Sequence, residues 1–237
     1  MLKQVPNALT LLNLFGGCLA ILAVIGHQDN WVIWLILFCN AVDFMDGFIA
    51  RKVGADGPLG RELDSLADVV SFGVVPGMIF ARLLADHYDL DLLSFGDNFW
   101  KVAPAFLLSV FAAYRLAKFN LDTRQSDEFL GLPVPACTMF VAGLLVLWGR
   151  DSFGLAQYIS NPWFVYIMIA FLSWMMISEV PLLNLKVKKL SWEGNELRIV
   201  FLLLSGVLAI AMGFAALAPV ILLYILLSIF RKLFFRP

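Results

Sequence analysis

Four aspartates stand at regular intervals between residues 43 and 68 of a chain that is otherwise rich in apolar residues. Asp43 and Asp46 are three positions apart, and Asp64 and Asp68 are four positions apart. On a helix, either spacing places both carboxylates of a pair on one face. If the two helices are antiparallel neighbours, the two acidic faces can meet across a gap. Oxygen ligands without histidine or cysteine favour a hard ion, Mg²⁺ or Mn²⁺, over Zn²⁺.

Two glycines and an arginine lie among these aspartates. Gly47 and Gly60 fall on the same helix faces as the aspartates, where a missing side chain lets a bulky ligand approach the backbone. Arg51 follows Gly47 by one turn and offers a planar fork that suits phosphate oxygens. Small residues in membrane helices also serve helix packing, which explains either glycine taken alone. The complete set predicts a site for a pyrophosphate-sized anion.

The composition is that of a membrane protein. The 237 residues are 61% hydrophobic and 15% charged, with a mean hydropathy of +0.86. Soluble domains are nearer about 45–50% apolar. A net charge of −1 gives no indication of a nucleic-acid partner. The three cysteines lack metal-ligand spacing, and both histidines fall in expected loops, so we expect neither a thiolate site nor a catalytic histidine.

A membrane setting makes the aspartates expensive unless they bind ions. One aspartate at the centre of a membrane helix costs about 2.5–3.5 kcal/mol, so four unpaired ones facing lipid would cost roughly 10–14 kcal/mol. That cost is comparable to the stability of a whole domain. Four carboxylates can bridge two divalent ions, an arrangement that supports in-line displacement at phosphorus. We therefore expect bound Mg²⁺ or Mn²⁺.

Apolar stretches long enough to cross a bilayer predict an all-α polytopic protein with about eight transmembrane helices. The expected spans are residues 8–26, 31–51, 58–84, 99–119, 134–150, 162–183, 197–214 and 216–235. The first is expected to be an uncleaved span and not a signal peptide. The last two are separated by a short turn and predict a C-terminal helical hairpin.

Basic residues predict the orientation. With the N-terminus in the cytoplasm, 14 of the 17 basic residues fall inside, and only Arg82, Lys101 and Arg150 fall outside. Both termini are then cytoplasmic, and the four aspartates lie near the cytoplasmic ends of the second and third helices. The chain shows no segment that targets it to an organelle, so we expect a bacterial plasma membrane.

The segment from Asp43 to Asp68 matches the signature D-x2-D-G-x2-A-R-x8-G-x3-D-x3-D at every position. By that signature the chain resembles the CDP-alcohol phosphatidyltransferase family over roughly its first six helices. The resemblance implies a six-helix catalytic core within residues 1–185, with residues 186–237 adding a cytoplasmic loop and two further helices. It also implies a homodimer that moves a substituted phosphate from a CDP-linked donor to an alcohol and releases CMP.

The resemblance assigns roles to individual residues. It implies that Asp43, Asp46, Asp64 and Asp68 hold two divalent ions, and that Gly47, Arg51 and Gly60 bind the CDP moiety. Asp68 would also take the proton from the incoming hydroxyl. A metal-bound carboxylate is a weak base, so we expect Asp68 to act partly by orienting that hydroxyl.

Two further stretches resemble the branch of the family that uses L-serine as acceptor. One is residues 6–13, and the other is residues 115–120 together with 129–136. The second places Arg115, Lys118 and Asn120 level with the aspartates, where a cation can pair with the carboxylate of serine. Lys118 serves equally well as an ordinary positive-inside anchor, whereas Arg115 lies deeper in its helix.

The expected reaction is therefore transfer of the phosphatidyl group from CDP-diacylglycerol to L-serine. One alternative is the same chemistry with glycerol 3-phosphate, inositol phosphate or choline as acceptor. Another is a divalent-ion transporter, because intramembrane carboxylates also line ion paths. A transporter should carry polar groups through the full membrane depth, whereas the aspartates here gather on one side.

Overall fold

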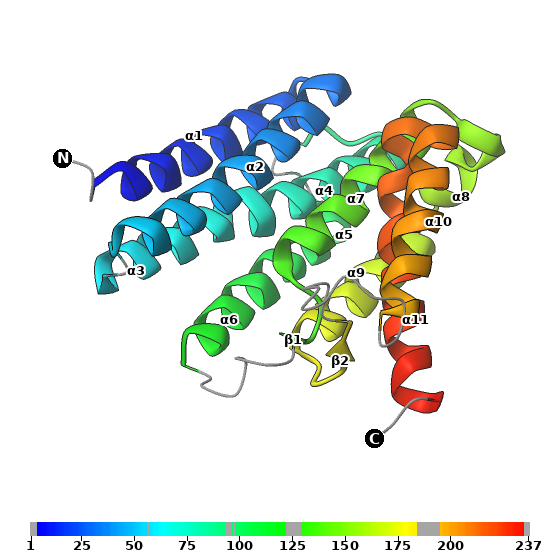
Figure 1. The fold of residues 1–237 in the computed structure, drawn as a ribbon. Helices are drawn as coiled ribbons and strands as arrows, with labels where there is room; N and C mark the ends of the chain where they lie inside the picture. The colour runs from blue at the N-terminus through cyan, green and yellow to red at the C-terminus, as the bar shows by residue number, and fades with distance from the viewer. Residues whose placement is uncertain are drawn as a thin grey trace.

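A computed structural model of the chain describes residues 4–55, 57–92, 96, 98–121, 129–183 and 195–234. Figure 1 shows a helical bundle in which α1, α2 and α3 lie at one side and the α10–α11 hairpin at the other. The elements are α1 (Val5–Ile25), α2 (Asp29–Val53), α3 (Pro58–Asp68), the π-helical η2 (Val69–Val74), α4 (Val75–His87), α5 (Phe99–Val102), η3 (Ala103–Phe106), α6 (Leu107–Leu121), β1 (Phe129–Leu130), α7 (Val134–Gly149), η5 (Ser152–Gly154), α8 (Ala156–Ile159), α9 (Pro162–Ile177), β2 (Pro181–Leu182), α10 (Glu196–Met212), η6 (Gly213–Ala216) and α11 (Leu217–Phe234).

These elements confirm an all-α polytopic membrane protein. Five helical stretches among the described residues are long and apolar enough to cross a membrane: 5–25, 29–53, 58–87, 99–121 and 196–232. The last of these stretches holds the whole of α10 and most of α11. The helices α7 and α9 are shorter and are also apolar. Together these segments correspond to the eight predicted spans, although the division at residue 185 lies outside the described residues.

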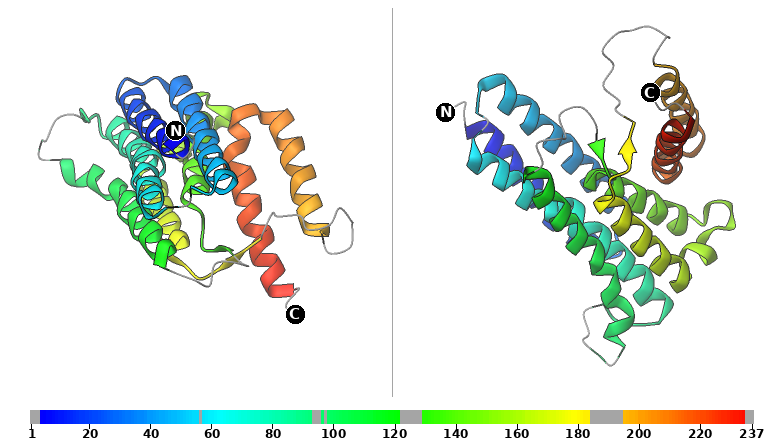
Figure 2. Two further views of the ribbon diagram at one scale, coloured as in Figure 1. Left: turned by 60° about the vertical axis from the view of Figure 1, so that its left-hand side comes forward. Right: turned by 90° about the horizontal axis from the view of Figure 1, so that it is seen from below.

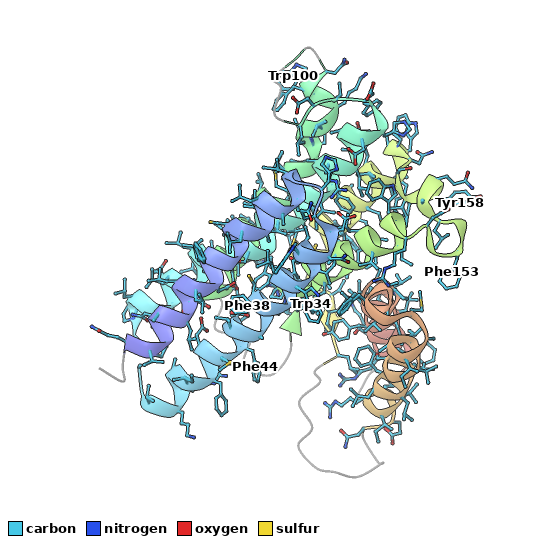
Figure 3. The ribbon with its side chains drawn as sticks, turned by 90° about the horizontal axis from the view of Figure 1, so that it is seen from above. Trp34, Phe38, Phe44, Trp100, Phe153 and Tyr158 are labelled. Carbon is cyan, nitrogen blue, oxygen red and sulfur yellow. The ribbon has the colours of Figure 1, made fainter. Side chains whose placement is uncertain are left out.

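Large aromatic side chains cover the outside of the bundle. Trp34 and Phe44 on α2 are 58% and 70% exposed (Figure 3), although one edge of Trp34 packs against Phe214 of η6. Trp100 and Tyr158 are also exposed, on the short helices α5 and α8. A surface of this kind suits lipid, and tryptophan and tyrosine near helix ends suit the membrane interface.

A π-helical segment follows directly after Asp68. Pro76 follows this segment and has no N–H to donate to the carbonyl of Phe72 one turn earlier. The carbonyl is satisfied instead from outside the helix, by the hydroxyl of Thr138 on α7 at 2.7 Å. Helix α7 is thereby fixed against the segment that continues the helix of Asp68.

Close packing holds α1 beside this segment. A Cβ placed on Gly17 would lie 2.8 Å from the Cα of Ser71, and one on Gly16 would lie 2.8 Å from Sγ of Cys39. Small residues at such positions let membrane helices approach closely. The polar residues of α1 consequently face α2 and α3 at short range.

Two departures from the predicted helices lie at the end of α9. The sixth span was expected to run to residue 183, but α9 ends at Ile177, because Pro181 disfavours helix at and before its own position. The residues beyond it form β2, which pairs antiparallel with β1. Figure 2 shows this small strand pair beside the α10–α11 hairpin.

Candidate active site

Three of the four aspartates converge between α2 and α3. Asp43, Asp64 and Asp68 each offer one carboxylate oxygen, and these oxygens lie within 4.8 Å of one another. Asp68 is buried, and the other two are half-buried. Like charges at this separation repel strongly in a medium of low dielectric. The cluster therefore needs positive charge to be stable, which a bound cation supplies.

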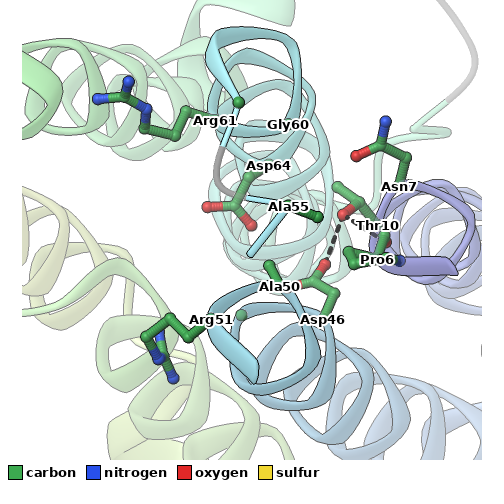
Figure 4. A pocket seen from close by; sticks show the side chains of 12 residues that line it. Pro6, Asn7, Thr10, Asp46, Ala50, Arg51, Ala55, Gly60, Arg61 and Asp64 are labelled. Atoms are coloured by element: carbon green, nitrogen blue, oxygen red, sulfur yellow. Dashed lines mark hydrogen bonds between the residues drawn. The ribbon is translucent and has the colours of Figure 1, made fainter. Parts of the chain in front are cut away.

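Asp46 lies outside this group and faces a pocket. The pocket has a volume of about 180 Å³ and is lined by residues from α1, α2, α3 and the turn between α2 and α3. Both Asp46 and Asp64 line it (Figure 4). Asp64 therefore belongs to the pocket and to the carboxylate cluster, so a ligand in the pocket lies beside any ion that the cluster binds.

The glycines and the arginine of the motif line the same pocket. Gly47, Arg51 and Gly60 all contribute to its wall, together with Arg61. A Cβ on Gly47 would lie 3.3 Å from Nη1 of Arg51, and one on Gly60 would lie 3.3 Å from Oδ1 of Asn7. Side chains at either position would occupy space that the ligand needs. Two guanidinium groups at the pocket suit a phosphorylated ligand.

Two residues of α1 orient the aspartates, and neither was among the predicted site residues. The hydroxyl of Thr10 donates to Oδ2 of Asp46 at 2.6 Å, as the dashed line in Figure 4 shows. The side-chain amide of Asn13 donates to Oδ1 of Asp68 at 3.2 Å. Both residues belong to the stretch 6–13, and the polar residues Asn7, Thr10 and Asn13, each three positions apart on a largely apolar helix, were the available signal.

The donor set fits a hard divalent ion. Carboxylate oxygens are the preferred ligands of Mg²⁺ and Mn²⁺. Oδ1 of Asn13 is buried and has no hydrogen-bond partner among the described residues. A buried oxygen of this kind is costly unless it accepts a hydrogen bond or a cation. The cluster of Asp43, Asp64 and Asp68 can therefore hold a metal ion, with a further oxygen close by.

The three residues expected to bind the acceptor lie in different surroundings. Arg115 is buried, makes no ion pair among the described residues, and lies close enough to Asp68 for their charges to interact. Lys118 is more exposed and pairs with Glu179 at 3.6 Å. Asn120 is exposed and donates to Oγ of Ser65 on α3 at 2.8 Å. Of the three, Arg115 is the buried one, and it carries a charge that makes no ion pair among the described residues.

Comparison with known proteins identifies the family. A family model described as CDP-alcohol phosphatidyltransferase matches residues 3–174. The chain belongs to the CDP-alcohol phosphatidyltransferase family. The resemblance carried by the motif is thus confirmed, and so is its extent, because the match ends within α9.

Relatives in this family support the same conclusion. The CDP-diacylglycerol–serine O-phosphatidyltransferase of Helicobacter pylori (strain ATCC 700392 / 26695) is 31% identical over 97% of this chain and 91% of its own length. The protein of that name from Bacillus subtilis (strain 168) is 30% identical over 76% of this chain and 89% of its own. The archaetidylserine synthase of Methanothermobacter thermautotrophicus is 32% identical over 74% of this chain and 67% of its own. The chain is accordingly an enzyme of phosphatidyl transfer to an alcohol.

Proposed function

We propose that this phosphatidyltransferase uses CDP-diacylglycerol as donor and L-serine as acceptor, giving phosphatidylserine and CMP. The observation that carries the proposal is the position of Asp64, which lines the phosphate-sized pocket and also completes the carboxylate cluster. The relatives named for serine transfer add support for the acceptor.

The donor fits the pocket between α1, α2 and α3. Gly47 and Gly60 leave room for the pyrophosphate against the backbone, while Arg51 and Arg61 offer donors to its oxygens. The acyl chains remain in the lipid beside the exposed apolar surface of α2. When bound by Asp43, Asp46, Asp64 and Asp68, two Mg²⁺ or Mn²⁺ ions neutralise the pyrophosphate and polarise the lipid-linked phosphorus.

The acceptor approaches from the side of α6. Arg115 binds the carboxylate of L-serine, because it is a buried guanidinium without an ion-pair partner among the described residues. Lys118 and Asn120 lie toward the rim of this side and contribute to serine entry and binding. Serine Oγ then attacks the phosphorus in line, and the phosphorus–oxygen bond to CMP breaks as the new bond forms.

Asp68 receives the proton of the serine hydroxyl late in this step. Its carboxylate is held by the Asn13 amide, so the oxygen that faces the hydroxyl has a fixed direction. Asp68 thus orients the nucleophile first and accepts its proton second. Catalysis depends mainly on positioning and charge neutralisation.

Two observations favour serine over phosphorylated acceptors and over ion transport. A phosphorylated alcohol would need more than one additional cation, whereas Arg115 is the buried, unpaired one near the cluster and Lys118 already pairs with Glu179. At the opposite end of the bundle, the buried Arg82 is paired with Asp29 and Asp86. Those paired charges serve structure, so they do not mark the exit of an ion path.

We also infer the setting of the enzyme from its basic residues and its family. The protein lies in a bacterial plasma membrane, with its active site and both termini on the cytoplasmic side. It acts as a homodimer. The catalytic core comprises residues 1–185, and residues 186–237 form the additional loop and hairpin. Chemical cross-linking in native membranes should give a dimer, and labelling of an added cysteine at the N-terminus should require a reagent that enters the cytoplasm.

The deciding experiment is incorporation of radiolabelled L-serine into lipid by the purified protein. We expect phosphatidylserine only when CDP-diacylglycerol and Mg²⁺ or Mn²⁺ are both present, with equal release of CMP. Glycerol 3-phosphate, inositol phosphate and choline should give little product in the same assay. Preference for one of these alcohols would contradict the proposed acceptor, and metal uptake into liposomes without CMP release would favour the transporter.

A further inference from the structure

The C-terminal helix α11 lies beyond the residues that the family model matches, yet it reaches the acceptor side of the site. Tyr224 on α11 is buried, and it lies within electrostatic range of Arg115 on α6. Arg115 therefore interacts electrostatically with Asp68 on α3 and with a residue of the hairpin. A helix that only faced lipid would not place a buried tyrosine there.

Hydrogen bonds join α11 to the strand pair next to this position. The hydroxyl of Tyr224 donates to the carbonyl of Leu183 at 3.1 Å. The backbone N–H of Leu183 donates to Oγ of Ser228 at 3.0 Å, and that hydroxyl in turn donates to the carbonyl of Tyr224 at 2.6 Å. Both Tyr224 and Ser228 are buried, so these bonds are shielded from competing solvent.

The segment held in this way carries the other side of the acceptor region. Leu183 follows β2, which pairs with β1, and the next residue after β1, Gly131, donates its N–H to the carbonyl of Val180 at 3.0 Å. Gly131 has φ +71°, and a Cβ there would lie 2.8 Å from the carbonyl oxygen of Met176, so the turn requires glycine. Glu179, which pairs with Lys118, lies just before β2.

Close backbone contact fixes α11 to the core. A Cβ on Gly143 of α7 would lie 2.2 Å from the backbone nitrogen of Ala218, so the two helices touch without an intervening side chain. This contact leaves α11 little freedom to move relative to α7. Tyr224 and Ser228 can thus hold Leu183 in a fixed position relative to the core.

We propose that Tyr224 and Ser228 of α11 are positioning residues for the acceptor site, holding Leu183 and the β1–β2 pair so that Arg115 meets the carboxylate of the acceptor. The inference rests on the proposed function, because it assumes an acceptor that carries a carboxylate. It assigns the hairpin a part in acceptor selection, in addition to packing against the core.

Steady-state kinetics of Tyr224→Phe and Ser228→Ala test the inference. Each change removes one hydroxyl and keeps the helix, so we expect KM for L-serine to rise about three- to tenfold, the effect of weakening one hydrogen bond. KM for CDP-diacylglycerol should stay within about twofold of the wild-type value, because the donor pocket lies between α1, α2 and α3. The preference for L-serine over ethanolamine, which lacks the carboxylate, should fall in parallel.

Tyr158→Phe is the matched control. It removes a tyrosine hydroxyl from the exposed helix α8 and should leave both KM values unchanged. Unchanged KM for serine in both α11 variants, or an equal rise in KM for both substrates, would overturn the inference while leaving the proposed function intact. If wild-type protein fails to transfer to serine, the proposed function fails, and the inference falls with it. A thermal melt of each variant checks that the fold is retained.

Discussion

The side-chain amide of Asn13 on α1 donates a hydrogen bond of 3.2 Å to Oδ1 of Asp68 on α3. It joins the last aspartate of the signature to a residue outside that signature. The side-chain oxygen of the same amide, Oδ1, is buried and has no hydrogen-bond partner among the described residues. Asn13 therefore both orients Asp68 and presents an oxygen toward a site that is rich in negative charge.

Replacing Asn13 by aspartate tests this role with almost no change in shape. Asn13→Asp removes the donor to Asp68 and adds a negative charge beside three carboxylates. A hydrogen bond to a charged group contributes about 1.5–3 kcal/mol, so we expect kcat to fall by roughly tenfold or more. Asn30→Asp makes the same exchange at the exposed start of α2, at the opposite end of the bundle, and should be silent. Wild-type kcat in Asn13→Asp would remove Asn13 from the site.

Thr10 should affect the donor more than the acceptor, because its partner Asp46 lines the donor pocket. Thr10→Val keeps the shape and removes the hydroxyl, and loss of a hydrogen bond to a carboxylate, worth about 1.5–3 kcal/mol, predicts a rise of roughly tenfold or more in KM for CDP-diacylglycerol. Thr138→Val removes the hydroxyl that satisfies Phe72 and should lower the melting temperature without changing either KM. A change confined to KM for serine in Thr10→Val would disagree with the site as described.

Filling the pocket should block the donor without unfolding the protein. A Cβ at Gly60 meets only the side-chain oxygen of Asn7, which can move, so Gly60→Leu should fold and insert. Its side chain would occupy much of a pocket of about 180 Å³, and we expect transfer to fall below a few per cent of the wild-type rate. Gly206→Leu on α10, where a Cβ meets nothing within 4 Å, is the control. Full activity in Gly60→Leu would place the donor elsewhere.

Arg115 and Lys118 should differ in their effect on serine. Arg115→Met removes a buried charge, and we expect KM for serine to rise at least about tenfold, because a charged hydrogen bond contributes about 1.5–3 kcal/mol. Lys118→Met breaks a surface pair with Glu179, which is worth about 0.2–1 kcal/mol, so its effect should be at most about fivefold. Initial rates at varied serine and saturating donor give both values. Equal effects would show that burial does not distinguish the two residues.

Much of the site could be predicted because its chemistry is local in sequence. Asp43 and Asp46 share a helix, and a short turn brings Asp64 and Asp68 back beside them, so spacing alone indicates that they meet. Spacing could not show that Asp46 faces the pocket while the other three aspartates form the cluster. That difference depends on how α1 approaches α2 and α3. Gly16 and Gly17 permit this approach, but their effect is visible only in three dimensions.

The features that the sequence did not reveal depend on contacts between distant segments. In the π-helical segment the carbonyl of Phe72 accepts a hydrogen bond from Thr138 of α7, which is 66 positions away in sequence. Strand β2 forms within an apolar run that predicts helix up to residue 183, although Pro181 in that run disfavours helix. The contact of Tyr224 with Leu183 joins residues 41 positions apart and follows no periodic pattern.

Manganese binding by the purified protein tests the central claim most directly. Electron paramagnetic resonance counts free Mn²⁺ during a titration of wild-type protein and of a variant carrying Asp43→Asn, Asp64→Asn and Asp68→Asn. Our account predicts about two tightly bound ions per wild-type chain and loss of that binding in the folded, membrane-inserted variant. Equal Mn²⁺ binding by the two proteins would contradict it.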